Sequence, residues 1–292
     1  MSNYSKIEWC DSTWNIVTGC TKVSEGCRNC YAEGIAHRFW GERKFTDVQT
    51  HPDRLDAPLH WKKPRRVFVN SMSDLFHKDV PFEFVDQVFA TMAWMQEHTF
   101  MVLTKRADRM EEFFNEAGNP SRRHILPNVW LGVSVENQQA ADERIPLLLK
   151  TPAAVRFVSV EPMLRPVDIT SYLNSLYIIG NVPENTIYEP PLDWVICGGE
   201  TGPNARPMHP DWARSLRDQC QAAGVPFFFK HWGEFISRDQ WISSGRGLSC
   251  IPEKVYFNDK PMGEQHIYRV GKKLAGRLLD GREWNEYPEA RK

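Results

Sequence analysis

Short apolar runs rich in β-branched residues alternate with longer amphipathic segments between residues 60 and 232, and this alternation constrains the fold more than any other feature. Each run has the length of a typical strand, and the runs are 66–71, 99–104, 129–134, 155–160, 194–197 and 226–230. The segments between them are predicted to be helices, at 82–96, 107–116, 140–149 and 210–223. Strands that alternate with helices in this way predict βαβ units and a parallel sheet.

One further strand is predicted at 13–18, which makes about seven βα units. This number predicts an α/β fold that is a complete or partial (β/α) barrel of about six to seven parallel strands, and a doubly wound sheet is the open alternative. Residues 174–193 contain two adjacent prolines and several Asn and are predicted to be a loop. We therefore expect a barrel domain over 1–235 and an irregular C-terminal extension, 236–292, packed on the barrel.

Charge and hydropathy exclude several classes of protein. The formal net charge is −1 over 292 residues, which argues against a polycation that coats nucleic acid. No run approaches the roughly 20 apolar residues of a membrane-spanning helix, and residues 1–10 carry no apolar secretory segment. A cytoplasmic protein with no membrane partner is the expectation.

Polar residues follow every predicted strand between 66 and 230. In parallel α/β folds the active site forms at the carboxyl ends of the strands, so these residues are expected to share one cavity. They are Ser73 and Asp74, Lys105, Ser134 and Glu136, Glu161, the pair Gly198 and Gly199 with Glu200, and Lys230 with His231.

Three cysteines, Cys20, Cys27 and Cys30, follow the first predicted strand within eleven residues. Crowded thiols in a reducing compartment usually bind metal or perform redox chemistry. Zinc would need a fourth ligand, for which Cys10 or His37 is a candidate, whereas a 4Fe–4S cluster held by three cysteines leaves one iron free to bind a small molecule. The spacing alone leaves both metals open.

The segment 19–32, GCTKVSEGCRNCYA, resembles the cysteine motif of radical S-adenosylmethionine (radical SAM) enzymes, and most closely that of a phage-associated three-Cys-motif family. The first gap between cysteines is six residues here, against three in the usual motif. Further similar blocks are 70–76, 103–106, 132–137, 159–162 and 197–202, in an order that is also similar to the spore photoproduct lyase branch of DNA-repair enzymes. The resemblance covers nearly the whole chain and is strongest over 7–235.

This resemblance implies a 4Fe–4S cluster on Cys20, Cys27 and Cys30 and an iron that binds SAM. It also implies an electron donor such as flavodoxin or ferredoxin and a substrate that is a nucleic acid or nucleotide, as in phage DNA modification or repair. The implied cofactor-binding residues are Ser73 and Asp74 for the methionyl ammonium, Ser134 and Glu136 for the ribose, and Gly198 and Gly199 for the adenine or carboxylate. The implied catalytic residues, which face the substrate, are Lys105, Glu161, Lys230 and His231.

Two other functions remain open on the residues alone. The first is a zinc-bearing nucleic-acid-binding module without catalysis, in which the basic run 62–66 beside Trp61 could follow a phosphate backbone. The second is a barrel hydrolase or lyase that uses Glu136, Glu161 and Lys230 without a cluster.

Overall fold

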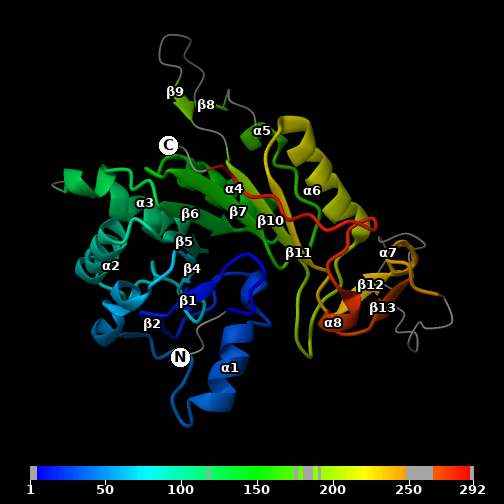
Figure 1. The fold of residues 1–292 in the computed structure, drawn as a ribbon, viewed down its shortest axis with the longest axis horizontal. Coiled ribbons are helices and arrows are strands. Elements are labelled where there is room, and N and C mark those ends of the chain that lie inside the picture. Colours follow the sequence, from blue (N-terminus) through cyan, green and yellow to red (C-terminus); the bar gives the residue numbers. More distant parts are fainter. Residues whose placement is uncertain are drawn as a thin grey trace.

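The structure is a computed structural model that describes residues 5–116, 119–173, 177–179, 187–189, 192–247 and 266–289. Its central feature is a seven-stranded sheet in the order β1-β4-β5-β6-β7-β10-β11, in which every neighbouring pair is parallel. The strands are β1 (Ser12–Trp14), β4 (Arg66–Val69), β5 (Thr99–Thr104), β6 (Val129–Ser134), β7 (Val155–Val160), β10 (Trp194–Gly198) and β11 (Phe227–His231). The sheet curls into a half-barrel (Figure 1), and within the described residues its two edge strands do not pair. The α/β fold is therefore confirmed as an open, partial barrel.

The main helices connect consecutive strands, as expected for βαβ units. They are α2 (Phe82–Trp94), α3 (Ala107–Asn115), α4 (Gln138–Leu149) and α6 (Pro210–Ala223), and each matches a predicted helix to within two residues at either end. The sequence explains the limits of α6, because Pro210 stands at its first position and Gly224, with φ +68°, ends it in the left-handed conformation.

Smaller elements complete the described chain. The helices are α1 (Tyr31–Phe39), α5 (Thr170–Leu173), α7 (Arg238–Ser243) and α8 (Lys272–Ala275), with 3₁₀ turns at Glu25–Cys27, Pro52–Arg54, Ala57–His60 and Pro120–Arg123. Three antiparallel pairs stand outside the main sheet: β2 (Val17–Thr18) with β3 (Gln49–Thr50), β8 (Tyr177–Ile179) with β9 (Ile187–Glu189), and β12 (Phe235–Ser237) with β13 (Ile267–Arg269).

Two sequence predictions need correction. The single strand predicted at 13–18 is divided between β1, which joins the sheet, and β2, which leaves it to pair with β3. The backbone N–H of Val17 donates to Oδ1 of Asn70 at 3.0 Å, so a side chain takes the place of a neighbouring strand where the chain turns away. The segment 174–193 was predicted to be a loop but contains β8 and β9; its other residues up to 191 lie outside the described residues.

The two faces of the sheet bury different sets of side chains. Residues such as Val67, Val102 and Leu131 pack under the covering helices in the larger core. The concave face forms a second core together with Trp9 of the N-terminal segment and Trp194 of β10; its other strand residues include Phe68, Met101, Trp130, Phe157 and Phe228. Strand side chains alternate between the two faces, which explains why the predicted strands are apolar nearly throughout.

The concave face becomes polar toward the carboxyl ends of the strands. Two residues beyond Phe157 on the same face stands Ser159, and two beyond Phe228 stands Lys230. The apolar lower half therefore fixes the sheet, and the polar upper half is available for a site.

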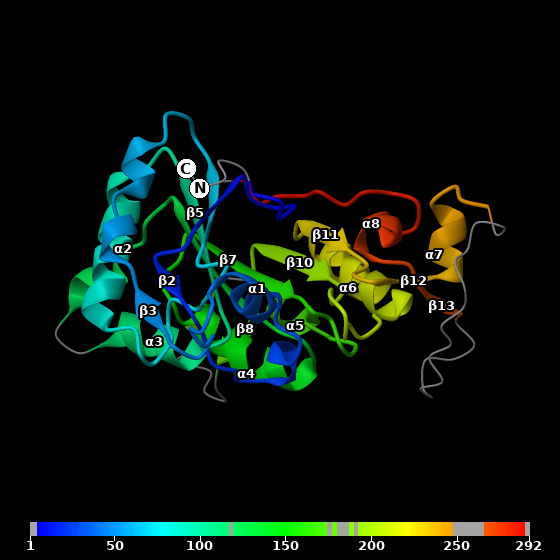
Figure 2. The ribbon, with the colours of Figure 1, turned by 90° about the horizontal axis from the view of Figure 1, so that it is seen from below.

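The C-terminal tail runs antiparallel along the edge strand β11. The N–H of Phe229 donates to the carbonyl of Trp284 at 2.9 Å, and the ring of Tyr287 packs on Trp194 with centroids 5.1 Å apart. Figures 1 and 2 show this tail (red) passing β11. The tail thus covers a sheet edge that would otherwise expose its backbone hydrogen-bonding groups.

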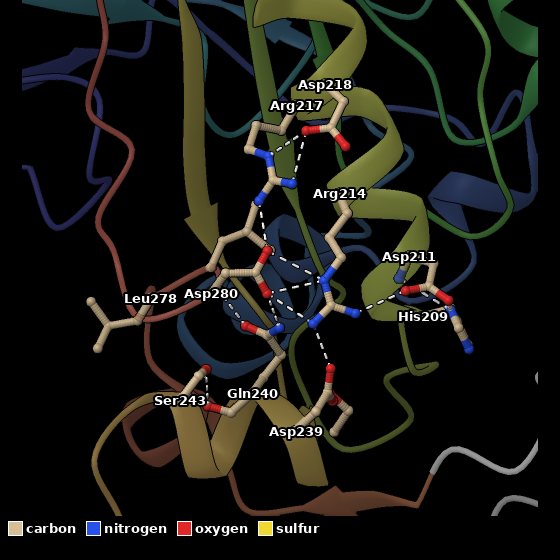
Figure 3. Close-up of polar contacts among 12 residues, drawn as sticks. His209, Asp211, Arg214, Arg217, Asp218, Asp239, Gln240, Ser243, Leu278 and Asp280 are labelled. Carbon is tan, nitrogen blue, oxygen red and sulfur yellow. Dashed lines mark hydrogen bonds and ion pairs between the residues drawn. The ribbon is translucent and has the colours of Figure 1, made fainter.

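A network around Asp280 fastens the start of this tail to α6 and α7 (Figure 3). The Asp280 carboxylate accepts hydrogen bonds from Arg214 at 2.8 Å, from Arg217 at 2.6 Å and from Gln240 at 2.6 Å. Burial favours the neutral carboxyl, but these donors outweigh it and hold the pKa of Asp280 well below its usual range.

Across the described part of the chain, we find no helix with the length and apolarity needed to cross a bilayer.

Candidate functional site

A cavity of about 390 Å³ opens at the carboxyl ends of the strands, within the range of small-molecule sites. It brings together nearly all of the predicted site residues: Cys20, Cys27, Cys30, Ser73, Asp74, Lys105, Ser134, Glu161, Gly199, Lys230 and His231. Glu136 and Gly198 are not among the described residues that line it.

Local structure explains how the three cysteines reach the cavity. Cys20 follows β2, Cys27 ends a 3₁₀ turn, and Cys30 is the N-cap of α1. All three are half-buried and free of disulfides.

The three thiols that line the cavity are a donor set for either a zinc ion or an iron–sulfur cluster. The described residues contain no group of three or more His, Cys, Asp or Glu side chains arranged to hold one metal ion. In a four-iron cluster each thiolate binds a different iron, and the three cysteines here line one cavity. The two candidates for a fourth zinc ligand lie elsewhere: the Cys10 thiol is buried against the Ser5 hydroxyl at 3.3 Å, and His37 lies on the exposed side of α1.

Arg106 ties the cysteine loop to the sheet. Its guanidinium donates to Sγ of Cys20 at 3.5 Å, to the carbonyl of Thr21 at 2.9 Å and to the Asp74 carboxylate at 3.0 Å. Burial raises the pKa of the Cys20 thiol to about 11, with a further contribution from Asp74, and Arg106 partly opposes this rise. Arg106 directly follows Lys105 at the end of β5, and no local pattern in the sequence marks it as a site residue.

The Asp74 carboxylate, predicted to bind an ammonium group, is used within the protein. It accepts hydrogen bonds from the Thr104 hydroxyl at 2.7 Å and from the backbone of Phe76 and Lys105, in addition to Arg106. Asp74 thereby joins the ends of β4 and β5 beneath the cysteine loop.

Glu136 supports the cysteine loop from below. Its carboxylate is fully buried and pairs with Arg144 at 3.0 Å. A Cβ on Gly26 would stand 3.0 Å from this carboxyl group, so the loop crosses directly over it and only glycine fits without a shift. In this arrangement the Glu136 side chain has no access to a ligand in the cavity.

The opposite wall of the cavity holds an ionisable cluster. Nζ of Lys230 lies 2.7 and 2.9 Å from the two Glu161 oxygens, and Nε2 of His231 lies 3.5 Å from the nearer one. Nδ1 of His231 accepts from the Gly233 N–H at 3.1 Å, which places the imidazole proton on Nε2, toward Glu161. Burial, with the charges of Lys230 and Lys272, holds the pKa of His231 well below its usual range, so the ring is neutral at pH 7.

Both predicted glycines serve this wall. A Cβ on Gly198 would stand 3.1 Å from the Glu161 carboxyl carbon, and a Cβ on Gly199 would stand 2.1 Å from the carbonyl oxygen of Trp232. Gly198 leaves room for Glu161, and Gly199 allows the ends of β10 and β11 to approach closely.

Two ion pairs at the cavity join residues whose pairing the sequence does not predict. Glu8 and Lys272, both lining the cavity, meet at 2.9 Å although they are 264 positions apart in the sequence. Glu200, which the sequence placed at a strand end, accepts from Asn29 of the cysteine loop at 3.1 Å and from Arg206 at 2.6 Å. No local pattern predicts either pairing, because the partners meet only in the folded chain.

Fold and site together define the class of protein. It is an open, parallel half-barrel with three free thiols in a cavity at the carboxyl ends of its strands. The chain belongs to the family described as "Protein of unknown function (DUF5131)", whose sequence model matches residues 4–288. Neither the curated proteins nor the solved structures contain a match to the chain.

Proposed function

We propose that the protein is an iron–sulfur enzyme that cleaves S-adenosylmethionine and uses the resulting radical on a nucleic acid or nucleotide. The observation that carries this proposal is the position of Cys20, Cys27 and Cys30 on one cavity that also holds the cluster of Glu161, Lys230 and His231. Thiolate sulfur is the preferred ligand of such clusters.

Cys20, Cys27 and Cys30 would hold the cluster, which when bound would supply the electron that cleaves the sulfonium bond of SAM. Arg106 keeps the Cys20 segment against the sheet. The hydroxyl oxygens of Ser73 and Ser134 offer acceptors to the methionyl and ribose groups, while the engaged Asp74 fixes the strand ends around them. Free thiols suit the reducing cytoplasm and a soluble electron donor such as flavodoxin or ferredoxin.

The opposite wall would bind the substrate. Lys230 provides a cation and Glu161 an anion within one hydrogen-bond length, so together they can orient a polar group and hold a proton at Oε1 of Glu161 or Nζ of Lys230. The half-buried Lys105 adds a second cation at the same cavity, which suits the phosphate of a nucleotide.

Anaerobic reconstitution with iron and sulfide, followed by dithionite and SAM, tests the proposal. We expect brown protein with about four irons per chain and formation of 5′-deoxyadenosine. Cys27→Ser should lose both, whereas the matched variant Cys10→Ser should retain both, because Cys10 lies outside the cavity lining. Colourless protein with one bound zinc would instead support the zinc module, and catalysis that survives Cys27→Ser would support a hydrolase or lyase.

A further inference from the structure

A second hollow, of about 650 Å³, lies on the outer side of the cysteine loop, between α1 and residues 201–204. It shares Asn29, Cys30 and Tyr31 with the lining of the inner cavity, so the two spaces adjoin at the loop that carries the thiols. The hydroxyl of Tyr31 donates to the carbonyl of Ser71 at 2.5 Å, which fixes its ring at this junction.

The face of α1 over this hollow is apolar yet uncovered. Tyr31, Ile35 and Phe39 follow one another at four-residue spacing, which places them on one side of the helix, and their exposed fractions are 49%, 41% and 72%. Only Ala32 and Ala36 of the helix are buried. Figure 1 shows α1 apart from the helices that cover the outside of the sheet. Exposed aromatic rings grouped in this way mark a binding surface.

The polar lining of the hollow is cationic. Arg28 and Arg38 line it, and no carboxylate of the described residues is within ion-pair distance of either guanidinium. Its one acidic lining residue, Glu33, is already paired with Lys22 at 2.9 Å. The hollow therefore combines unneutralised positive charge with exposed rings.

We infer that this outer hollow binds the nucleotides that flank the reacting one in a single-stranded nucleic acid. Cations that follow a phosphate backbone, together with aromatic rings on which bases stack, are the features by which proteins hold single strands. A strand seated on Phe39 and Tyr31 would pass over the cysteine loop and place its next nucleotide in the inner cavity. The inference rests on the proposed function for the identity of the inner site, but the binding itself needs neither iron nor SAM.

Fluorescence anisotropy with fluorescein-labelled dT12 and rU12 tests the inference on the full chain without cofactors. Phe39→Ala should weaken binding roughly 5- to 150-fold, as expected for the loss of one stacked base. Arg38→Gln should weaken binding and make the negative slope of log affinity against log salt concentration shallower by about one. Matched controls are Trp94→Ala, which removes an exposed ring at the end of α2, and Lys150→Gln, which removes an exposed cation after α4; both should bind as wild type.

The inference is overturned if wild type binds neither oligonucleotide, or if Phe39→Ala and Arg38→Gln bind as tightly as the controls. It is also overturned if these two variants bind oligonucleotide normally but are reduced more slowly by flavodoxin, since the hollow would then receive an acidic protein. Failure of the proposed function would appear separately, as absence of iron and of 5′-deoxyadenosine, whatever the anisotropy shows.

Discussion

Replacing Arg106 with Met separates the structural role of this residue from that of the thiols it supports. The Arg106 guanidinium connects three parts of the site through its contacts with Cys20, Thr21 and Asp74. Methionine keeps much of the aliphatic volume but none of these hydrogen bonds. We expect a loss of folding stability together with a poorly held cysteine loop.

The structure sets the size of the stability change. The side chains of Asp74 and Arg106 are only 8% and 10% exposed, and removal of one partner from a buried pair typically costs about 3–5 kcal/mol. Asp74 keeps three other donors in the variant, so we expect the lower end, about 3 kcal/mol. For a chain of this size that corresponds to a Tm lower by about 5 °C. Arg106→Lys, which keeps the charge but not the fork of donors, should lose about 1–2 kcal/mol.

Urea denaturation measures the loss of folding stability, and iron content after reconstitution measures how well the cysteine loop is held. Both are carried out at a temperature well below the Tm. A suitable control is Arg122→Met, because Arg122 is also a buried arginine paired with an aspartate, Asp86 at 2.6 Å, but it does not line the cavity. The control should lose stability and still take up iron, whereas Arg106→Met should take up less. Unchanged stability in Arg106→Met, or equal iron uptake by the two variants, would refute this reasoning.

Three further changes test other parts of the structure. Asp280→Asn should flatten the acid limb of the stability–pH profile. Arg214 chiefly holds the pKa of Asp280 down, so the ionised carboxylate stabilises the wild type above the unfolded pKa of about 3.9, and this stabilisation is lost as the pH falls further. Urea midpoints measured from pH 3 to 6 would show the difference between variant and wild type. Gly199→Ala should lower stability by more than about 2 kcal/mol in thermal denaturation, because its Cβ meets backbone at 2.1 Å, whereas Gly34→Ala, with open space around it, should be neutral or stabilising. Under the proposed function, Glu161→Gln should take up as much iron as wild type in reconstitution assays but lose turnover by roughly 10²- to 10⁴-fold. Full turnover would contradict the proposed role of Glu161 in proton transfer.

The strands and helices of the half-barrel could be predicted because each is specified by its own residues. Strands buried on both faces are predominantly apolar, as at 129–134 and 155–160, and the structure confirms both ranges. The exception is informative: residues 13–18 are predicted to be one strand, yet the chain turns at Asn15 and Ile16, whose neighbours pair with two different sheets. The pattern of apolar residues indicates which segments are buried strands, but not with which sheet each strand pairs.

The position of the cavity could also be predicted, because parallel strands bring their carboxyl ends to one edge. The pairing of charged side chains within the cavity could not be predicted. Asp74 and Glu136 follow strands just as Glu161 does, but each forms an ion pair with an arginine that lies next to it in the fold. Arg106 pairs with Asp74, and Arg144 pairs with Glu136. Which strand-end charges are available to a ligand depends on such partners. The partner lies eight residues away for Glu136, 32 for Asp74 and 69 for Glu161.

The openness of the half-barrel explains why this chain has room for a cavity at all. A closed eight-stranded barrel fills its interior with side chains from its own strands. Seven strands whose two edge strands do not pair with each other cannot do so. Here Trp9 from outside the sheet completes the lower interior, where it meets Phe68 with ring centroids 4.7 Å apart. Trp9 also lines the floor of the cavity. The same residue therefore closes the apolar core and bounds the polar space above it, so its replacement by Ala should both destabilise the fold and enlarge the site.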